Sequence, residues 1–279
     1  MQRPTRDDRF TGPEPTVAQT VAVAGFRLRP PVTLEHDLLL GALFFVAALL
    51  YSSVGHGGGS GYLAAMSLLG MPVAMMRPTA LVMNIGVAAI ALYKFSRASG
   101  FNWRLFLPFA LTSVPMAYVG GRIQLPVAWF GVLVGAVLLF SALRLFSETL
   151  QRETQAQVLR GPPPVAVAML VGTGIGLLSG LTGVGGGIFL SPLLVLMGWS
   201  TVRESAAPTA AFILVNSVSG LMGLLARQPT FPEALPFWVA AVLLGGSIGA
   251  TLGARRLGNV GLRRALAVVL LVAGAKMVF

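Results

Sequence analysis

The residues with the clearest chemical potential in this chain are two runs of glycine. The first run, Gly55–Gly61, reads GHGGGSG, and the second run, Gly183–Gly187, reads GVGGG and begins 128 residues later. Glycine lets the backbone leave helix geometry, so that its N–H groups are no longer used inside a helix. Free N–H groups at the start of a helix, together with the positive end of the helix dipole, bind anions. The two runs therefore predict a site in which the backbone itself binds an anion.

Both runs interrupt strongly apolar stretches. The 279 residues are 55% hydrophobic and 10% charged, whereas soluble domains carry roughly 25% charged residues. The composition predicts an integral membrane protein. Inside a membrane, backbone that leaves helix geometry is tolerated only where protein buries it or where it lines a polar cavity. A pair of interrupted spans in corresponding halves of a chain marks the binding site of many transporters.

The glycine runs lie among ten apolar segments, which form two sets of five. The first set is Leu38–Val54, Ser60–Leu69, Pro78–Phe95, Trp103–Gly121 and Val127–Phe146. The second set is Val165–Leu181, Ile188–Met197, Pro208–Leu225, Leu235–Gly253 and Leu262–Val278. Segments near 20 residues are long enough to cross a bilayer, whereas the second segment of each set is too short and directly follows a glycine run. We therefore expect an all-α integral membrane protein with about eight full spans and two short half-helices.

The two sets divide the chain into a disordered tail at residues 1–37, a first membrane repeat at 38–146, a cytoplasmic linker at 147–164 and a second membrane repeat at 165–279. The repeats are diverged but recognisable, since Pro108-Phe109 recurs as Pro236-Phe237. Basic loops face the cytoplasm, and the most basic loops of the two halves are not equivalent. The sequence therefore favours inverted repeats, with parallel four-span halves as the alternative.

Polar residues that follow the glycine runs are candidates to complete the site. Because both halves carry them after a similar Pro-Thr-Ala group, we expect their side chains to hydrogen-bond an oxyanion; the alternative is that they satisfy backbone freed by the prolines. For the glycines, the alternative is close helix packing. The predicted substrate-binding residues are Gly55, His56, Gly57, Gly58, Gly59, Ser60, Thr79, Asn84, Gly183, Gly185, Gly186, Gly187, Thr209 and Asn216.

The distribution of charge favours an anionic substrate. All nine carboxylates lie in the predicted tail, linker or loops, whereas cation sites and most proton relays use carboxylates inside spans. The net charge of +11 is expected to set topology and contact lipid headgroups rather than nucleic acid. Arg77 and Arg203, which follow the half-helices, are expected to extend to the membrane interface; the alternative is electrostatic recruitment of anions. With no cysteine and two histidines, the chain is predicted to hold no metal and no cofactor.

Two residues distinguish the first glycine run from the second. His56 is a candidate for coupling transport to protons; the alternative is a neutral imidazole that hydrogen-bonds the unwound backbone. Ser60 lies in Gly58–Gly61, which matches the Gly-x-Ser-Gly of rhomboid-type intramembrane serine proteases. No histidine follows His56 on a later span to act as the base. We therefore expect that the protein is not an enzyme.

The duplicated glycine runs, the Thr-containing stretches Arg77–Leu81 and Ala206–Ala210, and the glycine-rich fourth spans resemble the TauE/SafE family of sulfite exporters and related anion permeases over roughly residues 38–279. The resemblance implies a multi-pass protein of the bacterial inner membrane that moves a small sulfur-containing or organic anion, such as sulfite or a sulfonate. It places the substrate at the glycines of both runs. His56 and Ser60 depart from the symmetric pattern.

For the mechanism, we expect alternating access in which one helix bundle rocks against the other. Two alternatives stay open at this point: an anion channel that uses the same site, and a non-transporting membrane scaffold or accessory subunit. The expected partners are the small anion and the lipid bilayer, and the sequence leaves open whether the chain forms a homo-oligomer.

Overall fold

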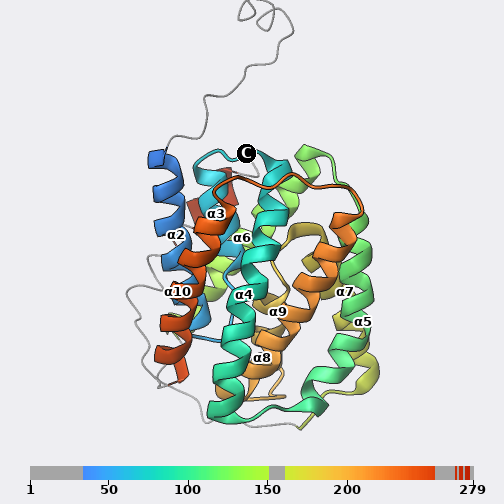
Figure 1. Cartoon of the computed structure of the whole chain (residues 1–279). Helices are drawn as coiled ribbons and strands as arrows, with labels where there is room; N and C mark the ends of the chain where they lie inside the picture. The colour runs from blue at the N-terminus through green and yellow to red at the C-terminus, as the bar shows by residue number, and fades with distance from the viewer. Residues whose placement is uncertain (1–33, 151–160, 255–267, 269, 273, 277–279) are drawn as a thin grey trace, which may run out of the picture.

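The computed structural model describes residues 34–150, 161–254, 268, 270–272 and 274–276, with side chains up to residue 144 in the first of these ranges. Helices dominate the described residues, and no strand occurs among them (Figure 1). The helices are α2 (Leu34–Ser52), α3 (Gly59–Leu68), α4 (Val73–Ser99), α5 (Trp103–Arg122), α6 (Val127–Leu150), α7 (Val165–Thr182), α8 (Gly187–Leu196), α9 (Val202–Leu225) and α10 (Leu235–Ala254). The predicted all-α fold is confirmed, while most of the predicted segment Leu262–Val278 lies outside the described residues.

Within the described residues, six helices are long and apolar enough to cross a membrane: α2, α4, α6, α7, α9 and α10. Helix α5 has 20 residues but is less apolar, because it contains two prolines and an arginine near each end. As predicted, each glycine run is followed by a ten-residue helix, α3 after the first and α8 after the second. These helices are too short to cross a bilayer of ~30 Å.

Several helices extend beyond the apolar segments expected from the sequence, and two of them, α2 and α6, continue into the predicted tail and linker. Helix α2 begins at Leu34, so that residues 34–37 of the predicted tail are helical. Helix α6 continues to Leu150, four residues into the predicted linker. The rest of the predicted tail lies outside the described residues. Carboxylates therefore occur in the end turns of helices, as Glu35 and Asp37 do in α2, where the polar interface of the membrane tolerates them.

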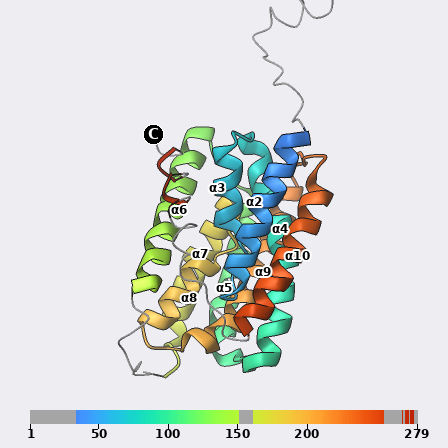
Figure 2. The same ribbon diagram turned by 90° about the vertical axis from the view of Figure 1, so that its left-hand side faces the viewer.

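The long helices form two groups of three. Figure 1 shows α2, α4 and α10 on one side of the molecule and α5, α7 and α9 on the other. We call these groups the α2 trio and the α5 trio. Helices α2 and α10 run parallel, because Gly245 lies against Phe45 and, eight residues further along both helices, Gly253 lies against Ser53. Figure 2 shows the α2 trio from its outer side.

The α5 trio has the same construction. Helices α5 and α7 run parallel, since Gly172 lies against the carbonyl group of Phe109 and Gly180 lies against that of Ala117. Between the trios, α4 and α9 pack together and run antiparallel: Arg203, at the start of α9, donates a hydrogen bond to the carbonyl oxygen of Ala98, at the end of α4, at 3.0 Å.

The two halves of the chain are related by an exchange of helices. Suppose that α2 is exchanged with α7, α4 with α9 and α5 with α10. The packed pair α5–α7 then becomes α10–α2, the pair α5–α9 becomes α10–α4, and the pair α4–α9 becomes itself; all of these pairs occur in the structure. Because the two trios run in opposite directions, each helix of this exchange is antiparallel to its counterpart. This is the geometry that inverted repeats produce, and the pair α4–α9 lies at its centre.

Glycines allow the closest helix contacts within each trio. A methyl group in place of Gly176 on α7 would collide with the backbone of Ser113 on α5, and one in place of Gly249 on α10 would collide with the backbone of Leu49 on α2. Small residues at this spacing let membrane helices approach until their backbones touch. Each trio is therefore a tightly packed unit.

This packing predicts a contrast between two glycines of the same helix. We expect Gly176→Ala to destabilise the protein by about 1–3 kcal/mol, because the added methyl group forces α5 and α7 apart. Gly174 has no atom near the position of the added carbon, so Gly174→Ala should leave stability unchanged or raise it by up to about 1 kcal/mol through helix propensity. Thermal unfolding of the purified variants in detergent measures both, and equal effects would contradict the close contact.

Candidate functional site

The first glycine run ends α2 and begins α3. Gly55 and Gly58 have φ values of 82° and 104°, a region that only glycine enters at little cost. Gly58 is the N-cap residue of α3. Hydrogen bonds on both sides hold the break: the amide of His56 donates to the carbonyl oxygen of Tyr51 at 2.9 Å, and the buried hydroxyl of Tyr62 donates to the carbonyl oxygen of Gly57 at 2.7 Å.

The second glycine run ends α7 and begins α8 in the same way. Gly183, Gly185 and Gly186 have φ values of 84°, 84° and 81°, and Gly186 is the N-cap residue of α8. The amide of Val184 donates to the side-chain oxygen of Thr182 at 3.3 Å. The local sequence explains both breaks, since left-handed backbone at several positions of one short segment requires glycine.

The two breaks meet where α4 crosses α9. Asn84 of α4 donates a hydrogen bond from Nδ2 to the carbonyl oxygen of Gly183 at 3.1 Å. A carbon added to Gly59 would lie 2.7 Å from the carbonyl oxygen of Val184, so the first turn of α3 touches the second break. Segments from opposite halves of the chain thus form one cluster at the centre of the molecule.

Backbone N–H groups at this cluster are available as donors. The first turn of any helix has N–H groups without an acceptor inside the helix. Here the amides of residues 57–59 and 185–188 donate no hydrogen bond to another described residue. The two short helices therefore direct unused donors and the positive ends of their dipoles into the region of the breaks.

Buried polar side chains lie on α4 and α9, the two helices that cross beside the breaks. The side chains of Thr79, Asn84, Thr209, Asn216 and Ser217 are completely buried. Among the described residues, no partner bonds the hydroxyl groups of the two threonines and the serine, the Oδ1 atom of Asn84, or either amide atom of Asn216. A buried polar atom left without a hydrogen bond costs about 1–3 kcal/mol. These unpartnered polar atoms therefore reduce stability at the crossing of α4 and α9, which come from opposite halves of the chain.

The predicted side chains differ in whether they contact the breaks. Asn84 and Thr209 lie against break glycines, since they come within contact distance of carbons added to Gly57 and Gly187. Ser60 is turned toward α2, where its hydroxyl donates to the Tyr51 hydroxyl oxygen at 2.7 Å. Thr79 and Asn216 are buried on α4 and α9.

Ser217 was missed in the sequence. Its Oγ atom lies 3.1 Å from a carbon added to Gly185. The signal for it was present, because Ser217 directly follows Asn216 in the polar stretch of this span, but the first half has no serine in a clearly matching place.

The break glycines also serve close packing. A carbon added to Gly57 would lie 2.6 Å from Oδ1 of Asn84, and one added to Gly187 would collide with Ile213. The packing role considered as the alternative for these glycines is therefore present in the structure. This close packing holds the unwound backbone against side chains of α4 and α9, such as Asn84 and Thr209.

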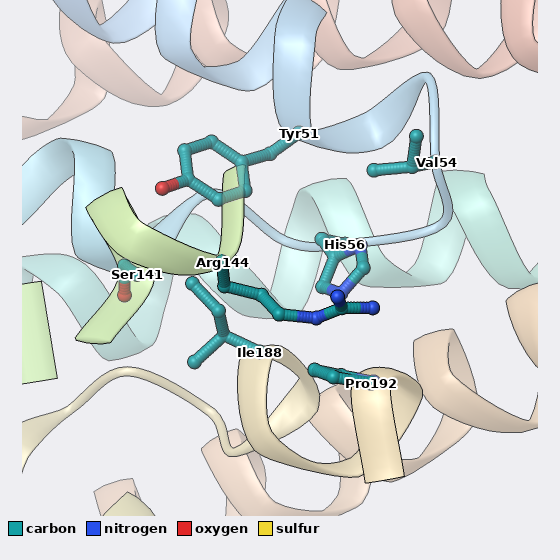
Figure 3. A pocket seen from close by; sticks show the side chains of 7 residues that line it. All are labelled: Tyr51, Val54, His56, Ser141, Arg144, Ile188 and Pro192. Carbon is teal, nitrogen blue, oxygen red and sulfur yellow. The ribbon is translucent and has the colours of Figure 1, made fainter. Parts of the chain in front are cut away.

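His56 lies in a small pocket beside the cluster. The pocket, which we call the Arg144 pocket, is lined by Tyr51, Val54, His56, Ser141, Arg144, Ile188 and Pro192 (Figure 3). In Figure 3 the guanidinium group of Arg144, from α6, extends across the pocket toward His56 and Pro192. Arg144 was missed in the sequence, although a single charge between Leu143 and Leu145 within a predicted span is a functional signal in a membrane helix.

Arg77 has a structural role that the sequence did not predict. Its side chain is only 7% exposed, so the expectation that it extends to the membrane interface is wrong. Its guanidinium group donates hydrogen bonds to the carbonyl oxygens of Gly120 and Ile123, at the end of α5. The last carbonyl groups of a helix lack partners inside the helix and attract cations, which explains why the side chain turns inward.

Comparison with known proteins identifies the family of the chain. The family model for the Sulfite exporter TauE/SafE matches residues 40–277. The chain belongs to the TauE/SafE family. It is 39% identical over 240 residues to the "Probable membrane transporter protein y4hK" of Sinorhizobium fredii (strain NBRC 101917 / NGR234), an alignment that covers 86% of this chain and 97% of that protein. No solved structure matches the chain.

The family assignment confirms the resemblance predicted from the glycine runs, both of which lie inside the matched residues. The chain is thus a multi-pass membrane transporter protein of the TauE/SafE type. Among the described residues, no group of three or more His, Cys, Asp and Glu side chains is arranged to hold a metal ion.

The hydrogen bond of Tyr62 predicts a specific effect on the first break. In Tyr62→Phe the carbonyl group of Gly57 loses its buried donor, and we expect stability to fall by about 1–3 kcal/mol. Tyr93 is 58% exposed, so Tyr93→Phe is the matched control and should change stability by less than about 0.5 kcal/mol. Thermal unfolding in detergent compares the two variants; a Tyr62→Phe protein as stable as the control would show that the bond does not hold the break.

Proposed function

We propose that this TauE/SafE protein is a permease for a small oxyanion, sulfur-containing or organic, such as sulfite or a sulfonate, in the bacterial inner membrane. The observation that carries the proposal is the set of buried, unpartnered polar side chains beside two unwound backbone segments from opposite halves. An oxyanion has several acceptor sites, and the cluster offers the donors that it needs.

The donors are of two kinds. The amides at the starts of α3 and α8 donate from the backbone, with two helix dipoles adding a favourable field for negative charge. The hydroxyl groups of Thr79, Thr209 and Ser217 and the amide of Asn216 donate from side chains that otherwise have no described partner. Binding an anion here satisfies groups whose burial is costly, which favours a site over a purely structural cluster.

The charged residues of the helices support an anion as the substrate. Arg77, Lys94 and Arg144 lie within the described long helices, and Lys94 donates hydrogen bonds to neutral oxygens of Ser247 and Thr251 on α10. Described helical carboxylates, in contrast, lie in the end turns of their helices. A positive interior attracts anions and opposes cations.

The two trios support alternating access. Each trio is closely packed through glycine contacts, whereas the α4–α9 crossing between them holds the underbonded polar groups. A rocking motion of one trio against the other changes this crossing and leaves the packing inside each trio intact, and the site would then open alternately to the two sides. Because corresponding helices of the two halves are antiparallel, the inward-open and outward-open states would have similar helix arrangements.

The proposal predicts an unusual pattern of variants on α9. Thr209→Val and Ser217→Ala remove hydroxyl groups that have no partner, so we expect unchanged or higher thermal stability but at least about a tenfold loss of sulfite or methanesulfonate flux in proteoliposomes, equivalent to about 1.4 kcal/mol. Ser219, on the same helix, donates to the carbonyl oxygen of Val114 at 2.6 Å. Ser219→Ala is the control: it should lower stability and leave flux intact.

Normal flux in both Thr209→Val and Ser217→Ala would contradict a substrate site at the crossing. Electrical currents far above transporter turnover would identify an anion channel instead of a transporter. A wild-type protein that shows neither flux nor stabilisation by small oxyanions would identify a scaffold or accessory subunit, since a ligand that binds only the folded state raises its stability.

The inverted arrangement predicts which side of the membrane each loop faces. The chain has no cysteine, so single cysteines can be introduced without background. We expect Thr230→Cys, in the loop between α9 and α10, to react with a membrane-impermeant maleimide from outside the cell. Pro162→Cys, just before α7, should react only after the membrane is opened. Labelling of both from the same side would contradict inverted repeats.

A further inference from the structure

The Arg144 pocket and the α4–α9 crossing border the same two unwound segments. On the first break, His56 lines the pocket, while a carbon added to the next residue, Gly57, would meet Asn84 at the crossing. Successive residues of one unwound segment therefore face the pocket and the predicted substrate site.

Residues at the second break are placed between the pocket and the crossing in the same way. Ile188, in the first turn of α8, lines the pocket, while a carbon added to the preceding residue, Gly187, would meet Thr209 at 3.0 Å on the crossing side. The pocket thus borders the start of α8, where the positive end of the helix dipole lies. Residues at both breaks thus lie between the pocket and the crossing.

The chemistry of the pocket suits a small anion. Arg144 presents a guanidinium group, which binds oxyanions through two parallel hydrogen bonds, and Tyr51 and His56 add polar rings. The other lining residues are Ser141 and three apolar residues, and no described carboxylate is among them. The pocket is small, so it suits an anion of a few atoms better than a large organic one.

The position along α6 indicates which end of the pathway this pocket serves. Arg144 lies six residues before Leu150, where α6 ends and the chain enters the segment that leads to α7. In the inverted arrangement this segment is cytoplasmic. The side chain approaches the breaks from α6, a helix that belongs to neither trio.

We infer that the Arg144 pocket is a vestibule on the cytoplasmic side of the pathway, in which Arg144 binds a small oxyanion before or after it occupies the site at the crossing. The inference rests on the proposed transport of oxyanions and adds a second binding position to it. Arg144 selects for negative charge, and the breaks between the pocket and the crossing form the gate. The residue acts by direct contact with the anion.

The test measures initial rates of sulfite flux in proteoliposomes as a function of sodium sulfite concentration, at constant ionic strength. In Arg144→Gln we expect the KM for sulfite on the cytoplasmic side to rise at least about tenfold, which corresponds to about 1.4 kcal/mol of binding, with a smaller change in kcat. Arg144→Lys keeps the charge and should restore a large part of the affinity. Arg104, exposed at the start of α5, provides the control: Arg104→Gln removes one positive charge outside the pocket and should leave KM unchanged.

A second pair of variants tests charge without removing Arg144. Ser141 lines the pocket and donates to the carbonyl oxygen of Val137 at 2.7 Å. Asp and Asn have nearly the same shape, so Ser141→Asp and Ser141→Asn differ chiefly in charge. We expect the Asp variant to have a KM at least about fivefold higher than the Asn variant. Because this pair compares two substituted proteins, it stays informative if Arg144→Gln fails to fold.

The outcomes separate the inference from the proposed function. Suppose that the wild-type protein transports sulfite. Equal KM values for Arg144→Gln and the wild type, or for Ser141→Asp and Ser141→Asn, then overturn the vestibule and leave the site at the crossing in place. A wild-type protein without sulfite or methanesulfonate flux overturns both. A rise in KM for Arg104→Gln equal to that for Arg144→Gln shows general surface attraction of anions and also overturns the vestibule.

Discussion

Backbone that leaves helix geometry inside an apolar layer must find its cover and its hydrogen bonds within the protein, and the rest of this structure depends on that constraint. The chain unwinds at Gly55–Gly58 and again at Gly183–Gly186. Neither segment is covered by its own half of the molecule alone. Asn84 of the first half bonds the second break, and the first turn of α3 lies against Val184. Each break is therefore sheltered by the other.

Glycine meets two different requirements in this fold. At the breaks, the left-handed backbone needs residues without a side chain. Within the trios, regular helices need small residues so that their backbones touch, as at Gly176 and Gly249. The trios are closely packed, and the crossing between them contains several buried polar groups without a partner among the described residues. In the proposed mechanism, ligand binding and relative motion occur at this same interface.

The sequence could predict features that depend on neighbouring residues. Hydropathy indicates the long helices, the glycine runs indicate where helices break and where α3 and α8 begin, and the repeat brings Asn84 and Thr209 forward as candidates. It could not predict the direction of individual side chains. Arg77 turns inward to the end of α5, and Arg144 reaches the first break from α6. Both directions depend on helices that lie far away in the sequence.

By itself, the sequence determined the all-α class, the paired breaks and the family, because helix formation, glycine conformation and apolar length are local properties of the chain. Only the tertiary structure decided that the breaks meet at the α4–α9 crossing and that His56 faces a pocket with Arg144. The physical reason is that these are contacts between distant segments, such as Asn84 and Gly183, which are 99 residues apart. Their geometry is set by how closely whole helices pack, and this is a property of both partners at once.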